Sequence, residues 1–170
     1  MQNSSRSFTL AIPTSDGEFL ARYSATGLCA LDFPSHSKPQ SPDANQAPVP
    51  PHVRLWHALT VKALASALSG KSPGRLPPLD LSSGTRFQQQ VWQALSQIAC
   101  GRNSSYAKVA EAIGRPKAVR AVGAACGANP IPVLVPCHRV LAADQRLGGF
   151  SGGLDWKRRL LEREGIRLSA

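Results

Sequence analysis

Three short runs near the N-terminus of the chain are rich in apolar and aromatic residues. Asp16-Gly17 separates the first two runs and Thr26-Gly27 the next two, and both dipeptides are typical of tight turns. Short apolar runs joined by such turns predict an antiparallel three-stranded sheet. The runs cover residues 7–12, 18–23 and 28–33.

After the third run, the pattern changes to a loop and then to helical spacing. Residues 34–51 come first, and their six prolines among polar residues predict an exposed, extended loop. A helix is then expected over residues 53–68, ended by Gly70, because apolar residues recur every three or four positions. A second linker rich in Pro, Gly and Ser covers residues 71–83.

The remaining chain predicts three short helices. Thr85 is a candidate cap of the first, which Gly101 ends. Ser104 or Ser105 caps the second, and Pro116 opens the third over residues 117–126. The apolar stripe of the first consists of Phe87, Val91, Trp92, Leu95 and Ile98, and that of the second of Tyr106, Val109, Ala110 and Ile113.

Gly-Arg-Pro joins the last two of these helices, which is the plan of a helix-turn-helix. Any two packed helices give a similar pattern, so DNA binding and plain packing both remain open. The third helix consists mostly of small residues around one long polar side chain, Arg120. Such a helix cannot read base edges but can approach a duplex closely, unless its small residues serve helix packing instead.

Basic residues exceed acidic ones by 20 to 10, and the excess is uneven. Residues 101–170 hold 12 basic and 5 acidic side chains, so +7 of the net charge of +10 lies there. A basic half of a chain favours a polyanionic partner, with nucleic acid first and an anionic membrane second. The alternative is a basic surface that serves only solubility.

Two further features narrow the class of protein. No apolar run approaches the roughly 18 residues of a membrane-spanning helix, and residues 1–6 lack the plan of a secretory signal. We therefore expect a cytoplasmic protein, associated with the nucleoid if bacterial. The cysteines form no Cys-x-x-Cys pair and have no histidine at zinc-finger spacing, so we expect neither a disulfide framework nor a metal. They are Cys29, Cys100, Cys126 and Cys137.

The candidate chemistry lies in residues 129–140, NPIPVLVPCHRV. Three prolines interrupt this apolar segment, so a regular central strand is excluded and the chain must reach Cys137 in a rigid, partly extended form. The imidazole of His138 and the guanidinium of Arg139 follow directly, and such neighbours favour the reactive thiolate. An isolated Cys-His pair would nevertheless usually be only a buried thiol.

The run PCHRV, with RAVGAACGANPIP before it and GGFSGG after it, resembles the active-site signature of the O6-alkylguanine-DNA alkyltransferases (methylated-DNA–protein-cysteine methyltransferases). The resemblance covers residues 87–165 and implies an α+β fold. A small ribonuclease-H-like α/β domain with the three-stranded sheet and the proline-rich loop would occupy residues 1–80. A mainly helical, winged-helix-like DNA-binding domain carrying the active-site cysteine would occupy residues 81–170.

The resemblance also implies a reaction. The chain would flip O6-alkylguanine out of duplex DNA and take its methyl or larger alkyl group onto Cys137, once and irreversibly, with O4-alkylthymine as a second candidate substrate. His138 would act as the base through a water, and Glu164 would orient that imidazole. Tyr106 would donate a hydrogen bond or a proton to the guanine. Without the resemblance, Glu164 reads as a solvated residue at a helix end.

Other residues would bind the alkylated base. The resemblance implies that Ser151 hydrogen-bonds O6, and that the backbone around Cys137 and Val140 lines the guanine pocket together with Pro132. Asn129 would join the helix-turn-helix to the active-site turn. The glycines around Ser151 permit a loop that closes over a base, although a plain surface turn has the same composition.

The resemblance implies contacts with the duplex as well. Arg120 would enter the space that the flipped base leaves, which offsets a cost of roughly a few kcal/mol. Ala118, Ala121 and Gly123 would lie against the minor groove. The implied partner is double-stranded DNA bound with little sequence preference by a monomer, without a cofactor, a metal or a membrane.

Two other classes of protein share parts of this pattern. A non-enzymatic binder of alkylated DNA would have the same fold but would lack the acceptor cysteine, whereas Cys137 is present. A Cys-His hydrolase of the papain type would share the dyad. It would need neither a helix-turn-helix nor a helix of small residues around Arg120.

Overall fold

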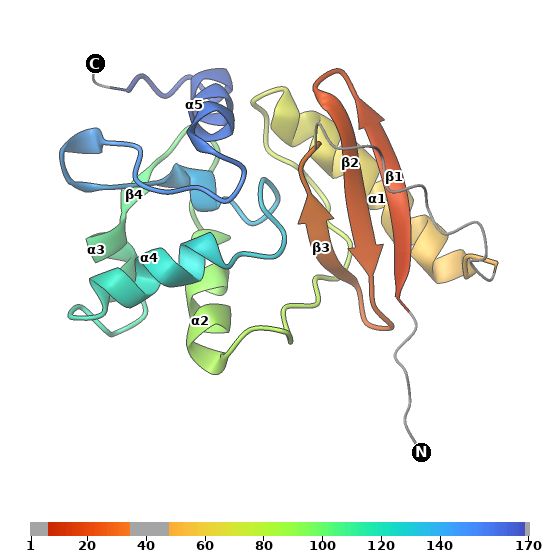
Figure 1. The fold of residues 1–170 in the computed structure, drawn as a ribbon, viewed down its shortest axis with the longest axis horizontal. Helices are drawn as coiled ribbons and strands as arrows, with labels where there is room; N and C mark the ends of the chain where they lie inside the picture. Colours follow the sequence, from red (N-terminus) through yellow and green to blue (C-terminus); the bar gives the residue numbers. More distant parts are fainter. Residues whose placement is uncertain (1–6, 35–47, 169–170) are drawn as a thin grey trace.

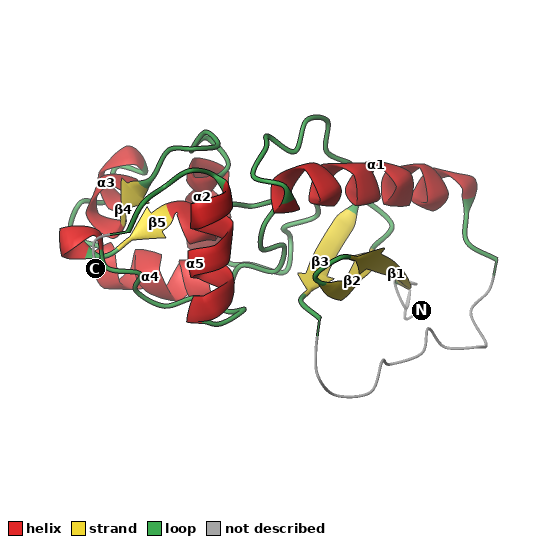
Figure 2. Cartoon of the chain, turned by 90° about the horizontal axis from the view of Figure 1, so that it is seen from above, coloured by secondary structure: helices red, strands yellow, loops and turns green. Residues whose placement is uncertain are grey.

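The protein, as a computed structural model, is described over residues 7–34 and 48–168, which form two lobes that lie side by side (Figure 1). The first lobe is an antiparallel sheet with strand order β1-β2-β3, and helix α1 covers one of its faces (Figure 2). Its elements are β1 (Phe8–Thr14), β2 (Gly17–Tyr23), β3 (Leu28–Asp32) and α1 (Pro51–Leu68).

The second lobe is mainly helical. A short parallel pairing of β4 with β5 sets Ser104 opposite Val140, and thereby brings the start of α3 beside the residues that follow Cys137. The elements are α2 (Arg86–Leu95), β4 (Ser104–Ser105), α3 (Tyr106–Ala112), α4 (Val119–Gly127), the 3-10 turn η1 (Cys137–Arg139), β5 (Val140–Leu141), the 3-10 turn η2 (Ala143–Gln145) and α5 (Leu154–Arg163).

The predicted sheet is confirmed, and its strand ends lie within two residues of the expected ones. Along β2, buried Phe19, Ala21 and Tyr23 alternate with more exposed residues, as a sheet with one covered face requires. The hydroxyl of Tyr23 lies 3.0 Å from Nδ1 of His57, which ties β2 to α1. Of the proline-rich loop expected over residues 34–51, residues 35–47 lie outside the described part of the chain.

The observed bounds of α2 and α4 differ from the sequence-based predictions in two places. Ile98 is not part of α2, which ends at Leu95, because i to i+3 hydrogen bonds such as that from Ile98 N to Leu95 O (3.0 Å) tighten the chain into a turn. Pro116 does not open α4. It occupies the second position of a turn that the bond from Ala118 N to Arg115 O (2.9 Å) closes, a position that proline favours, and α4 begins at Val119.

Strand β3 lies at the border between the lobes (Figure 1). The linker after α1 covers its free edge, since Leu28 N donates to Pro78 O and Asp80 N donates to Leu28 O, both at 2.8 Å. Leu31 N also donates to Pro130 O of the second lobe at 2.9 Å. One apolar core runs through both lobes, so the domain boundary near residue 80 stays a prediction. Within the described residues, no helix combines the length and apolarity needed to cross a membrane.

Thr85→Ala should destabilise the protein by about 1 kcal/mol. The Thr85 hydroxyl accepts from Gln88 N (3.2 Å), and Gln88 Oε1 accepts from Thr85 N (2.8 Å), so the substitution leaves the N–H of Gln88 without its acceptor at the start of α2. Urea denaturation measures the change, with Ser83→Ala as the control. Equal stability of the two variants would show that this capping box contributes nothing.

Candidate active site

A single side chain holds the turn that leads to Cys137. Asn129 is buried, and its Oδ1 accepts from Ile131 N at 3.0 Å. Its Nδ2 donates to Val135 O at 2.8 Å and to Cys137 Sγ at 3.1 Å. Val133, at the middle of the turn, has φ +73°, a conformation that a β-branched residue adopts only under strain. The expected absence of a strand before Cys137 is confirmed, and Asn129 fixes the thiol in place.

Cys137 begins the turn η1, and only 3% of it is exposed. Burial raises the pKa of its thiol, while the hydrogen bond from Asn129 and the charge of Lys157 act in the opposite direction without cancelling it. That the neighbouring imidazole and guanidinium favour the thiolate stays a prediction. In the structure, the ring nitrogen Nε2 of His138 and the guanidinium of Arg139 are bonded to Glu164.

Glu164 is a buried carboxylate surrounded by donors. Its side chain is 2% exposed, and its Oε1 accepts from His138 Nε2 and from Arg139 Nη2, both at 2.9 Å. Its Oε2 accepts from Arg139 Nε at 3.0 Å and from Gly101 N at 3.2 Å. Burial alone would raise the pKa of Glu164, but the hydrogen bonds from His138 and Arg139 outweigh it and lower the pKa to about 2. The group is therefore an anion at neutral pH.

The tautomer of His138 follows from this contact. An ionised carboxylate only accepts hydrogen bonds, so Nε2 must carry the proton that is shared with Glu164. Burial lowers the pKa of His138 despite the nearby carboxylate, so the ring is neutral at pH 7. Its Nδ1 is buried and hydrogen-bonds to none of the described protein groups. The Nδ1 atom of His138 thus keeps a basic lone pair, and His138 directly follows Cys137 in the chain.

Lys157 is a buried residue that sequence reasoning missed. Its Nζ donates to Val140 O at 2.7 Å and to Gly149 O at 3.3 Å, and lies 6.0 Å from the centre of the Tyr106 ring. Burial lowers the pKa of Lys157 to about 8, although the charges of the buried thiols oppose this. One signal was present in the sequence, because residue 157 shares a helix face with the apolar residues at 160 and 161.

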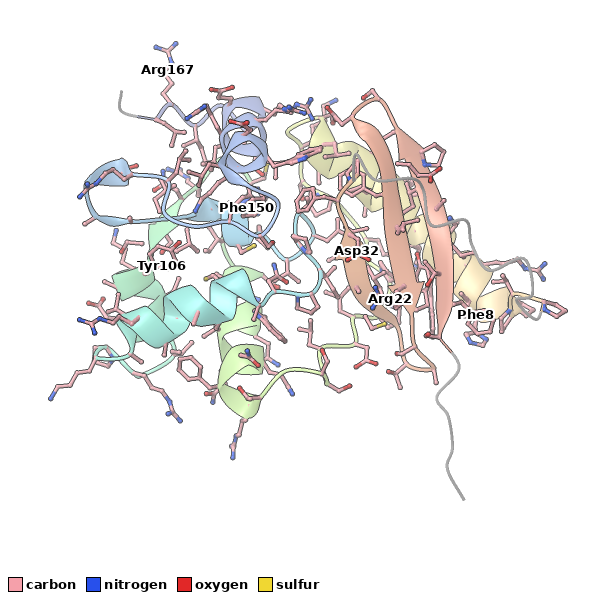
Figure 3. All side chains as sticks on the ribbon, in the orientation of Figure 1. Phe8, Arg22, Asp32, Tyr106, Phe150 and Arg167 are labelled. Carbon is pink, nitrogen blue, oxygen red and sulfur yellow. The ribbon has the colours of Figure 1, made fainter. Side chains whose placement is uncertain are left out.

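Tyr106 is the first residue of α3, and burial raises its pKa. The glycine-rich segment 148–153 lies against it, since a Cβ at Gly148 would lie 2.8 Å from the Tyr106 hydroxyl. Gly148 also has φ +63°, so both space and backbone require glycine here. Figure 3 shows Tyr106 and Phe150 in the helical lobe, with Phe150 on the side that faces the sheet.

The residues predicted to bind the base are only partly brought together. Asn129, Pro132 and Ser151 line one hollow of about 520 Å³ at the border between the lobes, to which Asp32 and Phe33 at the end of β3 also contribute. Ser151 is exposed. Cys137 and Val140 are buried and are not among the residues that line this hollow.

Helix α4 has two distinct faces. Its buried face packs on α2, where Trp92 Nε1 donates to Ala125 O at 2.8 Å. On the other face, Arg120 and Ala121 are exposed, so packing does not account for the small size of residue 121. Ala118 and Gly123 are half-buried, and a Cβ at Gly123 would lie 4.0 Å from the Tyr106 ring. The predicted DNA-contacting helix therefore lies next to the predicted catalytic tyrosine.

The sequence and the fold of this chain are similar to those of known proteins. Residues 86–166 match the family model described as 6-O-methylguanine DNA methyltransferase, DNA binding domain. The OGT of Mycobacterium tuberculosis, in its crystal structure with DNA, superposes with a TM-score of 0.73 at 37% identity, over 91% of this chain and 90% of that one.

Two curated relatives are similar over shorter parts of their own length. The bifunctional transcriptional activator/DNA repair enzyme Ada of Escherichia coli is 40% identical over 87% of this chain and 42% of its own. A methylated-DNA–protein-cysteine methyltransferase of Haemophilus influenzae is 55% identical over 49% of this chain and 46% of its own. The chain thus spans less than half the length of either relative.

Glu164→Gln should lower the free energy of unfolding by about 3 kcal/mol at neutral pH, because it leaves the buried Arg139 without its anion. Since the pKa of Glu164 is lowered on folding to about 2, its stabilisation is complete above the ordinary value of 4.5 and is lost as the pH falls toward 2. Denaturation curves at several pH values should therefore converge for the variant and the wild type in acid. The exposed Glu162→Gln is the control, and a constant difference down to acid pH would contradict the assignment.

Proposed function

The chain belongs to the 6-O-methylguanine DNA methyltransferase family, and we propose that it repairs DNA by moving an alkyl group from guanine O6 to its own Cys137. One observation carries this proposal. A buried thiol held by Asn129 precedes a buried imidazole whose Nε2 is fixed by Glu164 at 2.9 Å. A thiol acceptor, a base and an orienting carboxylate are what such a transfer needs.

We propose the following transfer step. The thiol of Cys137 loses its proton through a water to Nδ1 of His138, and Glu164 stabilises the resulting imidazolium. The thiolate sulfur attacks the alkyl carbon, a C–S bond forms, and the C–O6 bond breaks with its electron pair passing to the guanine. Tyr106 donates a hydrogen bond or a proton to the base as this charge develops. The product thioether has no easy route back to a thiol, so each molecule reacts once.

The buried ammonium of Lys157 supports both the thiol and the glycine-rich segment in this proposal. Its charge partly offsets the rise that burial causes in the pKa of Cys137, and its bonds to Val140 O and Gly149 O join the residues after the thiol to the glycine-rich segment. We propose that Ser151 of that segment hydrogen-bonds O6, and that Pro132 and the backbone of Val140 line the pocket. Repair of O4-alkylthymine would use the same groups.

The partner in this proposal is double-stranded DNA containing O6-alkylguanine, bound by a monomer. The exposed face of α4 with Arg120, Ala121 and the adjoining Ala118 supports a minor-groove surface without base-specific contacts. Arg120 would replace the flipped base in the stack. In the same reading, the first lobe is ribonuclease-H-like, and the second is a winged-helix-like domain that carries Cys137.

Intact-mass spectrometry after mixing with a duplex that contains O6-methylguanine tests this function. We expect the mass of one methyl group per molecule, mapped to Cys137, and no further turnover. Cys137→Ala should abolish the gain while duplex binding persists, and Cys126→Ala is the matched control that keeps it. Methylation mapped to Cys126, or many turnovers per molecule, would contradict the proposal.

Arg120→Ala should slow repair in a duplex by roughly ten- to hundredfold, which corresponds to about 1–3 kcal/mol of lost stacking. Transfer from free O6-benzylguanine should be unchanged, because a free base has no stack to leave. Single-turnover rates on both substrates in one buffer make the comparison, with Lys117→Ala, at another exposed basic residue, as the control. An equal loss on both substrates would mean that Arg120 supports the pocket rather than base flipping.

A further inference from the structure

We propose that Asp16, in the turn between β1 and β2, is a positioning residue for the reaction. It acts through Arg163, the residue that precedes Glu164, and thereby makes the sheet lobe part of the machinery that orients His138. This inference rests on the proposed function, because it concerns the base of that transfer. Neither Asp16 nor Arg163 touches the thiol or the imidazole.

The contact between the two residues is a bidentate ion pair across the lobes. Arg163 Nη1 donates to Asp16 Oδ2 at 2.8 Å, and Nη2 donates to Oδ1 at 2.7 Å. Asp16 is well covered, with 10% of its side chain exposed, and Arg159 lies 3.6 Å from the same carboxylate. A two-point planar contact fixes direction as well as distance, unlike a loose surface pair.

A second set of contacts holds the same stretch of backbone. Arg163 Nη1 also donates to Leu68 O at 3.0 Å, at the end of α1. The next turn of the chain is in direct contact with α5, because a Cβ at Gly70 would lie 1.9 Å from the carbonyl oxygen of Arg163. Gly70 has φ +77°, so glycine is required there for both reasons. The last turn of α5 thus contacts the sheet lobe through the side chain of Arg163 and through its own backbone.

Glu164 follows directly and points the other way, into the second lobe. It is the C-cap of α5, where a helix end tends to fray, and its carboxylate must meet His138 Nε2 at 2.9 Å. The pairing of Arg163 with Asp16 holds this end of the helix at a fixed position. Loss of the pairing would loosen the carboxylate, and the imidazole would lose the partner that fixes its tautomer.

Asp16→Asn removes the charge while keeping the shape, and Asp155→Asn is its control. Asp155 pairs with Arg158 at 3.7 Å on the exposed side of the same helix. We expect Asp16→Asn to lose on the order of tenfold in the single-turnover rate near neutral pH, on duplex and on free O6-benzylguanine alike, because small displacements of a catalytic group are costly. The control should transfer at the wild-type rate.

The pH profile separates positioning from general loosening. At high pH the thiol of Cys137 ionises without help from His138, so the rate of Asp16→Asn should approach that of the wild type. The groups facing His138 are Glu164, Arg139 and Lys157, and titration of Lys157 near its pKa of about 8 affects both proteins equally. A rate ratio that stays constant over the whole range would overturn the proposal.

A double-mutant cycle with Glu164→Gln gives the second readout. If Asp16 acts through Glu164, adding Asp16→Asn to Glu164→Gln should cost almost no further rate, whereas independent effects would multiply. Multiplying effects, or an Asp16→Asn protein that transfers at the wild-type rate, would refute the positioning role. Both outcomes require that the wild type itself is alkylated on Cys137, so failure of the proposed function would be seen separately.

Discussion

A carboxylate that is 2% exposed can remain ionised only if donors surround it, and the second lobe is arranged around this requirement at Glu164. The three donors come from two distant places in the sequence: the imidazole of His138 and the guanidinium of Arg139 are neighbours, and the backbone N–H of Gly101 lies far before them. The hydrogen bonds between Glu164 and these donors fix the end of α5 against the turn that holds Cys137. The same contact leaves Nδ1 of the imidazole as the basic nitrogen, so stability and chemistry depend on one buried anion.

Other residues of helix α5 connect Glu164 to the rest of the site and to the sheet lobe. One turn before Glu164, the apolar Leu160 and Leu161 bury the helix face, and a further turn back Lys157 binds the carbonyls of Val140 and Gly149. Next to Glu164, at the same end of α5, Arg163 pairs with Asp16 of the sheet lobe. The aromatic contacts of Phe33 with Trp156 (5.0 Å between ring centres) and with Phe150 (5.6 Å) also cross between the lobes. The sheet therefore supports a site to which it contributes no reacting atom.

Local signals in the sequence were read correctly where local interactions decide the structure. The three strands, the cap at Thr85 and the proline-broken turn before Cys137 are examples. The end of α2 before Ile98 was missed because no breaker marks it, and the role of Pro116 because a turn and a first helical turn favour proline alike. Lys157 and the partner of Arg139 were missed for another reason. Contacts between residues far apart in the sequence bury both Lys157 and Glu164, whereas lysine and glutamate side chains are usually exposed. The roles of the site residues remain proposals drawn from the family resemblance.

In this mechanism, Glu164 holds His138 as the neutral tautomer protonated on Nε2, with Nδ1 free to accept the proton of Cys137. Nitrogen-15 NMR of the ring of His138 in the unreacted protein at neutral pH tests it most directly. We expect an Nε2 signal that carries a proton and an Nδ1 signal that does not. An imidazolium protonated on both nitrogens, or a neutral ring protonated on Nδ1, would contradict it.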